Sequence, residues 1–495
     1  MPGVAILALL FSVLVTTVAH AQPPPPAHVP TQAPVKAPPA KSGLGLPDAM
    51  LNQSWTGDLD GMVKRRLIRV LVPYSKTFYF VDRAVQRGLS YDVTRLLERD
   101  LNKKLKTGNI QVSVVCVPSA RDELIPGLLE GKGDIAMGNL TITPGRLKQI
   151  DFTDPTYRNI SEIVVTGPGA EPIATPADLA GKEVYLRKSS SYYESIERLN
   201  AELARLGKTK VKVRPAPENL EAEDILEMVN AGLVKITVVE FDIAAFWKKV
   251  FTKLELHQDV ELRSGGELAW MIRKDSPQLK AELDGWIARF GKTGQRTDIL
   301  ARYLKSTKWA KSATSPGEIK KFEQMVELFK KYGDQYDLEY LLLMAQGYQE
   351  SELNQTARSP VGAIGVMQLM PATGKDMKVG DITRLEPNIH AGAKFLRAMV
   401  DEHYANEPMD RLNKGLFAFA AYNAGAGRIN QLRKLAARRG LNPNVWFDNV
   451  ELMAAEKIGR ETVTYVSNIY KYYLAYQMIE EQRAERQKTK ESVTR

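Results

Sequence analysis

Glu350 is the residue best placed for acid–base chemistry in this sequence. It ends the stretch Leu-Leu-Leu-Met-Ala-Gln-Gly-Tyr-Gln-Glu at 341–350, which is mostly apolar. A carboxyl group at the end of such a stretch enters poorly solvated surroundings, where desolvation raises its pKa and keeps it protonated and able to donate. Glu352 is the obvious competitor, but two residues along a helix rotate a side chain by about 200°. We therefore expect Glu350 to carry the chemistry and Glu352 to be solvated or to cap the helix.

Three further motifs follow this glutamate. They are Ser-Pro-Val-Gly-Ala-Ile-Gly-Val-Met-Gln-Leu-Met-Pro at 359–371, Ala-Ala-Tyr-Asn-Ala-Gly at 420–425 and Glu-Thr-Val-Thr-Tyr-Val at 461–466. With Gln-Glu-Ser-Glu-Leu-Asn at 349–354, they make this part of the chain resemble the soluble-lytic-transglycosylase domain in motif identity, order and spacing. The resemblance implies a lysozyme-like helical fold that cuts the glycan of murein.

The resemblance also implies the reaction. Glu350 would protonate the glycosidic oxygen as general acid, and would then take the proton from the C6 hydroxyl of N-acetylmuramic acid. That hydroxyl replaces water and leaves a 1,6-anhydro end, in a ring closure that profits from a high effective concentration. Glycosidases usually need two carboxylates. Here the N-acetyl group of the sugar can stabilise the cation, so that one essential acid suffices.

The same motifs imply residues that contact the glycan. Gly365, with Gly362, permits close approach of a backbone loop to the sugar, and Met367 supplies apolar contact. Ser359 and Gln368 hydrogen-bond the substrate or orient the glutamate. The expected substrate-binding residues are Ser359, Gly365, Met367, Gln368, Tyr422, Asn423 and Glu461.

Three of these residues lie in the later motifs. Tyr422 is expected to hydrogen-bond Glu350 or to stack on a sugar, and Asn423 to fix a turn. Glu461 either polarises the site or is simply the acidic residue at a helix N-terminus. We expect His390 to lie on a helix surface, and the sequence contains no metal-ligand spacing.

The elements that position these residues change in character along the chain. Between residues 67 and 291, strand and helix patterns alternate, which predicts β-α-β units and a mainly parallel sheet covered by helices on both faces. After residue 317 the strand patterns vanish. Long helices are expected there at 317–332, 338–352, 388–404, 412–423 and 461–481.

The first region has its own resemblance. Leu-Ile-Pro-Gly-Leu-Leu-Glu-Gly-Lys-Gly-Asp at 124–134, Leu-Thr-Ile-Thr-Pro-Gly-Arg at 140–146 and Ile-Asp-Phe-Thr-Asp-Pro-Thr-Tyr at 150–157 resemble the extracellular solute-binding family that captures polar amino acids. In that family, two α/β lobes close on the ligand. Arg146 would grip its carboxylate, because a guanidinium fork pairs two carboxylate oxygens. The alternative for Arg146 is a surface arginine in a Thr-rich turn.

Thr141, Ser190 and Glu240 complete the expected regulatory ligand set. Glu240 stands where the family more usually has an aspartate that binds the ligand's amine. Asn139 and Gly145 also depart from the family pattern. A peptide or cell-wall fragment that carries a carboxylate is therefore at least as plausible a ligand as a free amino acid.

Composition and the N-terminus bound the remaining choices. The chain has 495 residues, a net charge of +10 and one cysteine, Cys116, which excludes an intramolecular disulfide and is expected in a buried strand. An apolar run at 4–19 followed by Ala-His-Ala predicts a secretory signal peptide, with an uncleaved membrane anchor as the alternative. A Pro-rich spacer follows.

The sequence thus predicts a multidomain protein: an α/β two-lobed periplasmic solute-binding domain plus a mainly α lysozyme-like domain. The expected segments are a signal peptide (1–21), a linker (22–60), a solute-binding regulatory domain (61–305), a junction (306–316), a catalytic domain (317–482) and a charged, frayed tail (483–495).

The expected function is a secreted lytic transglycosylase that acts on peptidoglycan strands in the periplasm. Its first domain would sense a carboxylated muropeptide, peptide or amino acid. Peripheral association with the outer membrane is compatible with the sequence, no cofactor is expected, and nucleic-acid binding lacks any motif. The alternatives are a transport or sensing protein with a murein-docking helical domain, and a hydrolytic muramidase that uses a second carboxylate.

Overall fold

The computed structural model describes residues 53–82, 85–307 and 316–494. The signal peptide and most of the linker predicted at 1–60 lie outside these residues, as does most of the predicted junction. Within the described residues, no helix is both long enough and apolar enough to cross a membrane.

An α/β region forms the first half of the described chain. Its strands are β1 (Leu67–Val72), β2 (Phe80–Asp82), β3 (Val85–Arg87), β4 (Ser113–Pro118), β5 (Ile135–Thr141), β6 (Asp151–Phe152), β7 (Tyr157–Thr166), β8 (Glu183–Leu186), β9 (Lys212–Pro215), β10 (Ile236–Glu240) and β11 (Glu255–Ile272). Its helices are α2 (Leu59–Lys64), α3 (Leu89–Leu105), α4 (Leu124–Leu129), α5 (Pro144–Leu147), η1 (Pro176–Leu179), α6 (Ser191–Arg205), α7 (Ala222–Asn230), α8 (Phe241–Lys248), α9 (Pro277–Phe290) and α10 (Gly294–Leu304).

The main sheet of this region has the strand order β10-β7-β11-β5-β1-β4, with β6 paired to β11. β1 pairs in parallel with β4 and β5, but β11 is antiparallel to β5, β6 and β7, and β10 is antiparallel to β7. The expectation of a mainly parallel sheet is therefore wrong. The reason is β11, a strand of 18 residues that lies antiparallel to β5, β6 and β7 in the middle of the sheet instead of closing one more β-α-β unit.

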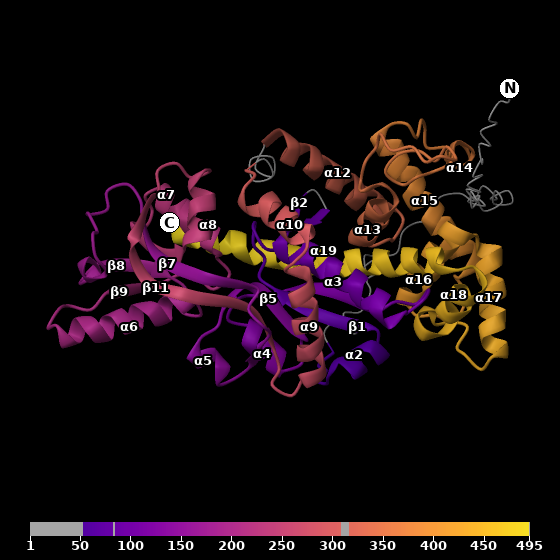
Figure 1. The fold of residues 1–495 in the computed structure, drawn as a ribbon. Helices are drawn as coiled ribbons and strands as arrows, with labels where there is room; N and C mark the ends of the chain where they lie inside the picture. Colours follow the sequence, from indigo (N-terminus) through magenta and orange to yellow (C-terminus); the bar gives the residue numbers. More distant parts are fainter. Residues whose placement is uncertain (1–52, 83–84, 308–315, 495) are drawn as a thin grey trace, which may run out of the picture.

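The sheet connects two lobes. One lobe holds β1, β4 and most of β5, with α3, α4, α9 and α10 beside them, and the other holds β10 and most of β7, with α6, α7 and α8 (Figure 1). β11 pairs with β7 over its first part and with β5 and β6 over its last part, so that it runs through both lobes. The two-lobed α/β prediction is confirmed.

The second half of the described chain is helical. Its helices are α12 (Pro316–Gln335), α13 (Tyr340–Ser351), α14 (Pro371–Met377), α15 (Leu385–His403), α16 (Arg411–Ala424), α17 (Ala426–Arg438), η2 (Trp446–Val450), α18 (Glu451–Lys457) and α19 (Arg460–Thr494). The apolar face of α13 packs against α12 and α19, and α16 packs against α15, α17 and α19. The mainly helical character predicted for this half is confirmed.

The last helix, α19, joins the two halves. It leaves the helical half, packs against β4 of the first lobe and reaches Asn219, just before α7, near its end (Figure 1). Nζ of Lys471 lies 3.0 Å from Oε2 of Glu98 on α3, and Asn219 of the second lobe donates a 2.8 Å hydrogen bond to Thr489. The charged end of the chain, expected to fray, continues this helix to Thr494. Its Glu, Lys, Gln, Arg and Ala residues are good helix formers.

Candidate functional site

Glu350 lies in the last turn of α13, where the helix leaves the core. Residues 341–348 of α13 are buried, and Glu350 itself is half-buried. Burial raises the pKa of Glu350 from 4.5 to about 7. A carboxyl group with this pKa is substantially protonated near neutrality, as a general acid must be. Glu352 is exposed at the C-cap with a φ of 54°, as expected for a solvated or capping residue.

Tyr465 on α19 is the partner of Glu350. Its hydroxyl donates a 2.5 Å hydrogen bond to Oε1 of the glutamate, and Gln346, one turn earlier on α13, donates a 3.3 Å bond to the Tyr465 oxygen. The hydrogen bond from Tyr465 opposes the effect of burial on the pKa of Glu350. Sequence reasoning singled out Glu461 of this motif and missed Tyr465, four residues and one helical turn further on.

The loop between α13 and α14 passes beside this helix. Gly365 has a φ of 77°, and a Cβ atom there would lie 2.6 Å from both Nδ2 of Asn388 and Nε2 of Gln355. Gln368 also has a positive φ, 43°, and its side-chain amide donates a 2.8 Å bond to the Gly365 carbonyl. Ser359 accepts a 2.9 Å bond from the amide of Ala363. These three predicted residues shape the loop.

Met367 and Tyr422 meet beneath the same loop. Tyr422 on α16 donates a 2.7 Å hydrogen bond to the Met367 carbonyl and packs edge-on against Phe395. The hydroxyl of Tyr422 thus donates to the loop backbone and not to Glu350, which was one of the two expected roles. The Met367 side chain is only 1% exposed. It packs against α15 at Gly392, so its apolar contact in this structure is with the protein.

Asn423 ties α16 to the start of α19. Its side-chain oxygen accepts a 2.6 Å hydrogen bond from Thr462. Glu461 is exposed in the first turn of α19, where a negative charge is favourable to the helix dipole. The two contacts of α19, to Asn423 and to Glu350, fix the rotation that aims Tyr465 at the carboxyl group.

The electrostatics of the site point to one acid. Burial is the cause that raises the pKa of Glu350, and the only side chain that perturbs it among the described residues is Tyr465. In a carboxylate pair the raised pKa comes instead from repulsion between the two charges. Within the same described residues, no group of three or more His, Cys, Asp or Glu side chains could hold a metal ion.

In the α/β region, Arg146 lies between the two lobes. Its guanidinium donates 2.8 Å and 2.9 Å hydrogen bonds to the backbone carbonyls of Thr141 and Ser189. Thr141 lies 3.1 Å from Ser191, oxygen to oxygen. Ser190 is the N-cap of α6 and accepts a hydrogen bond from the amide of Tyr193. The structure thus brings the predicted residues of both lobes together around Arg146.

Glu240 joins this group from the end of β10. It accepts hydrogen bonds from the side chains of Asn139 and Thr141. Burial, with the nearby charge of Glu162, raises the pKa of Glu240 to about 8, so the group is mostly neutral near pH 7. A neutral carboxyl group is a weaker partner for an amine than a charged carboxylate.

Sequence reasoning missed a second set of contacts between the lobes. Arg121 of the first lobe makes a bidentate pair with Glu221 of the second, at 2.8 Å from Nη2 and from Nε, and Arg187 adds a 2.8 Å bond to the same carboxylate. Ser75 donates a 2.9 Å bond to Glu223. These pairs hold the lobes together in this structure. The sequence did not predict them because their members lie far apart in the chain.

Comparisons with known proteins agree with this division. Residues 68–306 match the family of bacterial extracellular solute-binding proteins, family 3, and residues 327–444 match the transglycosylase SLT domain. A protein of Desulfosudis oleivorans named membrane-bound lytic murein transglycosylase F is 26% identical over 82% of this chain and 89% of its own length. A protein of Idiomarina loihiensis with the same name is 27% identical over 85% of this chain and 92% of its own.

Among solved structures, an ancestral amino acid-binding protein that is a precursor of cyclohexadienyl dehydratase is 25% identical. It covers 50% of this chain and 99% of its own, with a TM-score of 0.41.

Proposed function

The chain is a two-domain relative of the lytic murein transglycosylases, with a family 3 solute-binding domain before a transglycosylase SLT domain, and we propose that it cleaves murein glycan without water. The bond cleaved is the β-1,4 bond between N-acetylmuramic acid and N-acetylglucosamine. The product ends in 1,6-anhydro-N-acetylmuramic acid. This chemistry needs one group that first gives a proton and then takes one.

Glu350 is that group in the proposal. Its protonated carboxyl gives a proton to the glycosidic oxygen while the bond from that oxygen to C1 breaks. The resulting carboxylate then takes the proton of the C6 hydroxyl, whose oxygen bonds to C1, so that Glu350 ends the cycle protonated. The hydroxyl of Tyr465 donates to the carboxylate during this step, because it already bonds Oε1.

The observation that carries the proposal is the way in which the pKa of Glu350 is raised. Burial raises it to about 7, and no carboxylate among the described residues contributes to the shift. A hydrolytic muramidase that uses a second carboxylate would need one across from Glu350, and the sequence candidate, Glu461, is exposed. The anhydro-forming reaction is therefore favoured over hydrolysis.

Mass spectrometry of murein digests tests this directly. The protein, Glu350→Gln and Glu352→Gln are each incubated with purified murein. We expect the unchanged protein and Glu352→Gln to release disaccharide peptides one water lighter than muramidase products, and Glu350→Gln to release none. Glu352→Gln is a matched control, because it makes the same change two residues away on an exposed side chain. Products of hydrolytic mass would contradict the proposal.

For the first domain, we propose a ligand that carries a carboxylate and binds at Arg146, with Thr141, Ser190 and Glu240 around it. Arg146 uses two of its five N–H donors on backbone carbonyls, which leaves donors for a ligand. Calorimetric titration with a muropeptide, a peptide and an amino acid tests this. Arg146→Gln should abolish binding of whichever ligand binds, and unchanged binding by that variant would refute the assignment.

We propose further that this ligand changes the lytic rate. The support is the domain order together with α19, which carries Tyr465 and also contacts both lobes. Equal lytic rates with and without a ligand of proven binding would exclude this regulation. The proposed location is the periplasm, with peripheral association at the outer membrane, and cell fractionation tests it.

A further inference from the structure

A cavity of about 510 Å³ lies where the two lobes of the α/β region join. Its walls come from the N-terminal end of α3, from β5, β7 and β11, from α9 and α10, and from the segment 154–156 and the junction of β10 and α8. Every residue that lines it lies between 78 and 304, so it belongs entirely to the α/β region. Its volume is within the range of small-molecule sites, roughly 300–1,000 Å³.

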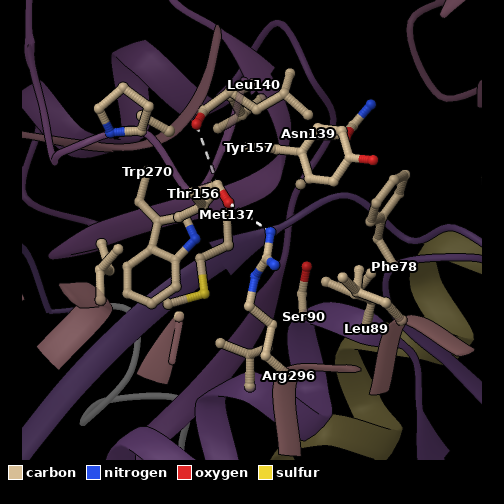
Figure 2. A pocket seen from close by; sticks show the side chains of 18 of the residues that line it. Phe78, Leu89, Ser90, Met137, Asn139, Leu140, Thr156, Tyr157, Trp270 and Arg296 are labelled. Atoms are coloured by element: carbon tan, nitrogen blue, oxygen red, sulfur yellow. Dashed lines mark hydrogen bonds between the residues drawn. The ribbon is translucent and has the colours of Figure 1, made fainter. Parts of the chain in front are cut away.

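Most of the cavity wall is apolar. Trp270 and Met137 form one side, and Phe78 and Leu89 lie across from them (Figure 2). Phe290 of α9 also lines it. A wall of this composition favours a ligand with an apolar body, because burial of apolar surface drives its binding.

Ser90 places a hydroxyl group in this apolar space. The residue is only 4% exposed, and its hydroxyl points into the cavity (Figure 2). This hydroxyl makes no side-chain hydrogen bond within the described residues and is open to the cavity, so a ligand there can bond to it.

Arg296 places a positive charge beside the same space. It extends from α10 into the cavity, where it donates a 3.2 Å hydrogen bond to the backbone carbonyl of Thr156 (Figure 2). Its guanidinium also lies 5.9 Å from the ring centre of Tyr157. Within the described residues no carboxylate forms an ion pair with it. Its unused N–H donors are therefore available to an anion.

The other charged groups of the wall already have partners or face solvent. Arg158 pairs with Glu267, and Asp242 accepts the hydroxyl of Tyr157. Glu240 is bonded to Asn139 at the wall, and Asp154 is exposed. Arg296 is thus the lining cation without a carboxylate partner in the part of the chain that the structure describes, and an anionic ligand is favoured over a cationic one.

We propose that this cavity binds a small apolar carboxylate, whose body packs against Trp270 and Met137 and whose carboxylate pairs with Arg296 and Ser90. The site is separate from the one proposed around Arg146. Arg146, Thr141 and Ser190 do not line the cavity, whereas Glu240 touches both regions. The inference does not depend on the lytic reaction, because it concerns only binding to the α/β region.

Calorimetric titration of the full chain tests the proposal with two probes, octanoate and phenylbutanoate. Each probe is compared with its uncharged alcohol, octanol or phenylbutanol. We expect at least one carboxylate to bind, and its alcohol to bind roughly tenfold more weakly or worse, because a hydrogen bond to a charged group contributes about 1.5–3 kcal/mol. Failure of both carboxylates to bind, or equal binding of acid and alcohol, would overturn the proposal.

Variants locate the binding. Arg296→Gln should weaken carboxylate binding by roughly tenfold or more, and Arg296→Lys, which keeps the charge but not the guanidinium fork, should weaken it less. Arg302→Gln is the matched control, since Arg302 lies on the same helix, pairs with Asp92 and does not line the cavity. Full binding by Arg296→Gln would place the carboxylate elsewhere and refute the site.

A cavity-filling variant provides an independent check. Leu300→Trp adds volume to the wall on α10, and should weaken the carboxylate and its alcohol alike. Circular dichroism confirms that each variant is folded. Unchanged binding of the carboxylate by folded Leu300→Trp would contradict the proposal.

Discussion

The hydroxyl of Tyr465 lies 2.5 Å from Oε1 of Glu350, although 115 residues separate them in the chain. The contact joins the last helix to the helix that carries the proposed acid. It stabilises the carboxylate form, whereas burial stabilises the protonated form, and the balance raises the pKa of Glu350 to about 7. Both forms are therefore accessible near neutral pH, which a group that alternates between acid and base requires.

Tyr465→Phe should change both the rate and its pH dependence. Loss of the donor disfavours the carboxylate, so the pKa of Glu350 should rise by about one unit or more. Activity that needs protonated Glu350 would then persist to higher pH, while the maximal rate falls by about tenfold because the carboxyl is less well oriented. The measurement is anhydro-product formation from pH 5 to pH 9. Tyr472→Phe, the same change on the same helix, should leave the profile in place.

Glu350→Gln should stabilise the fold at high pH only. The pKa of Glu350 is raised from 4.5 to about 7. The folded protein therefore holds this proton more tightly than the unfolded chain does. The free energy of unfolding is unaffected below pH 4.5 and falls by about 3 kcal/mol in all as the pH rises from 4.5 through 7. Thermal unfolding should therefore differ little between protein and variant at pH 4.5, and the variant should unfold at the higher temperature at pH 8. A variant less stable at pH 8 would contradict the raised pKa.

The position and burial of Glu350 could be predicted because they follow from a local pattern. An apolar helix that ends in a carboxyl group fixes the environment of that group within ten residues. Tyr465 could not be found in this way. Its motif was recognised, but which side of α19 faces Glu350 depends on tertiary contacts, such as the bond from Thr462 to Asn423.

The direction of the strands was also beyond local pattern. Alternating strands and helices predicted parallel pairing, which holds for β1 with β4 and β5. β11 was not predicted because its sequence, Glu-Leu-His-Gln-Asp-Val-Glu-Leu-Arg-Ser-Gly-Gly-Glu-Leu-Ala-Trp-Met-Ile, has a polar residue or glycine at ten of its first thirteen positions, Gly265 and Gly266 among them. Only its last five residues are buried throughout, so only those have the composition of a core strand.

Lys471→Met should destabilise the protein through the ion pair between its halves. Lys471 and Glu98 are largely buried, and Glu98 also accepts bonds from Arg95 and from the amide of Val114. Removal of Lys471 leaves the buried Glu98 carboxylate with less compensating charge, so the free energy of unfolding should fall by about 2 kcal/mol. Adding Glu98→Gln to this variant should recover part of that loss. Urea unfolding of both single variants and the double variant measures this. Arg439→Met, which breaks an exposed pair with Glu456, should not move the midpoint.

Gly365→Ala and Gly362→Ala should separate backbone strain from steric conflict in the loop beside Glu350. Both glycines have positive φ, 77° and 94°, so alanine is strained at either position, by about 1 kcal/mol. Only at Gly365 would the new Cβ meet other atoms, at 2.6 Å from Nδ2 of Asn388 and Nε2 of Gln355, whereas at Gly362 nothing lies within 4 Å.

These two side chains cannot easily retreat. Asn388 is fully buried and bonds the loop at Ile364 and Met367, and Gln355 bonds the carbonyls of Ile382 and Thr383. Gly365→Ala should therefore lower the free energy of unfolding by more than about 2 kcal/mol and remove most of the lytic activity. Gly362→Ala should keep its activity. Thermal unfolding and murein cleavage, measured on both variants, test this difference. Equal effects of the two changes would contradict the prediction, because they would show that the loop shifts to accommodate the added methyl group.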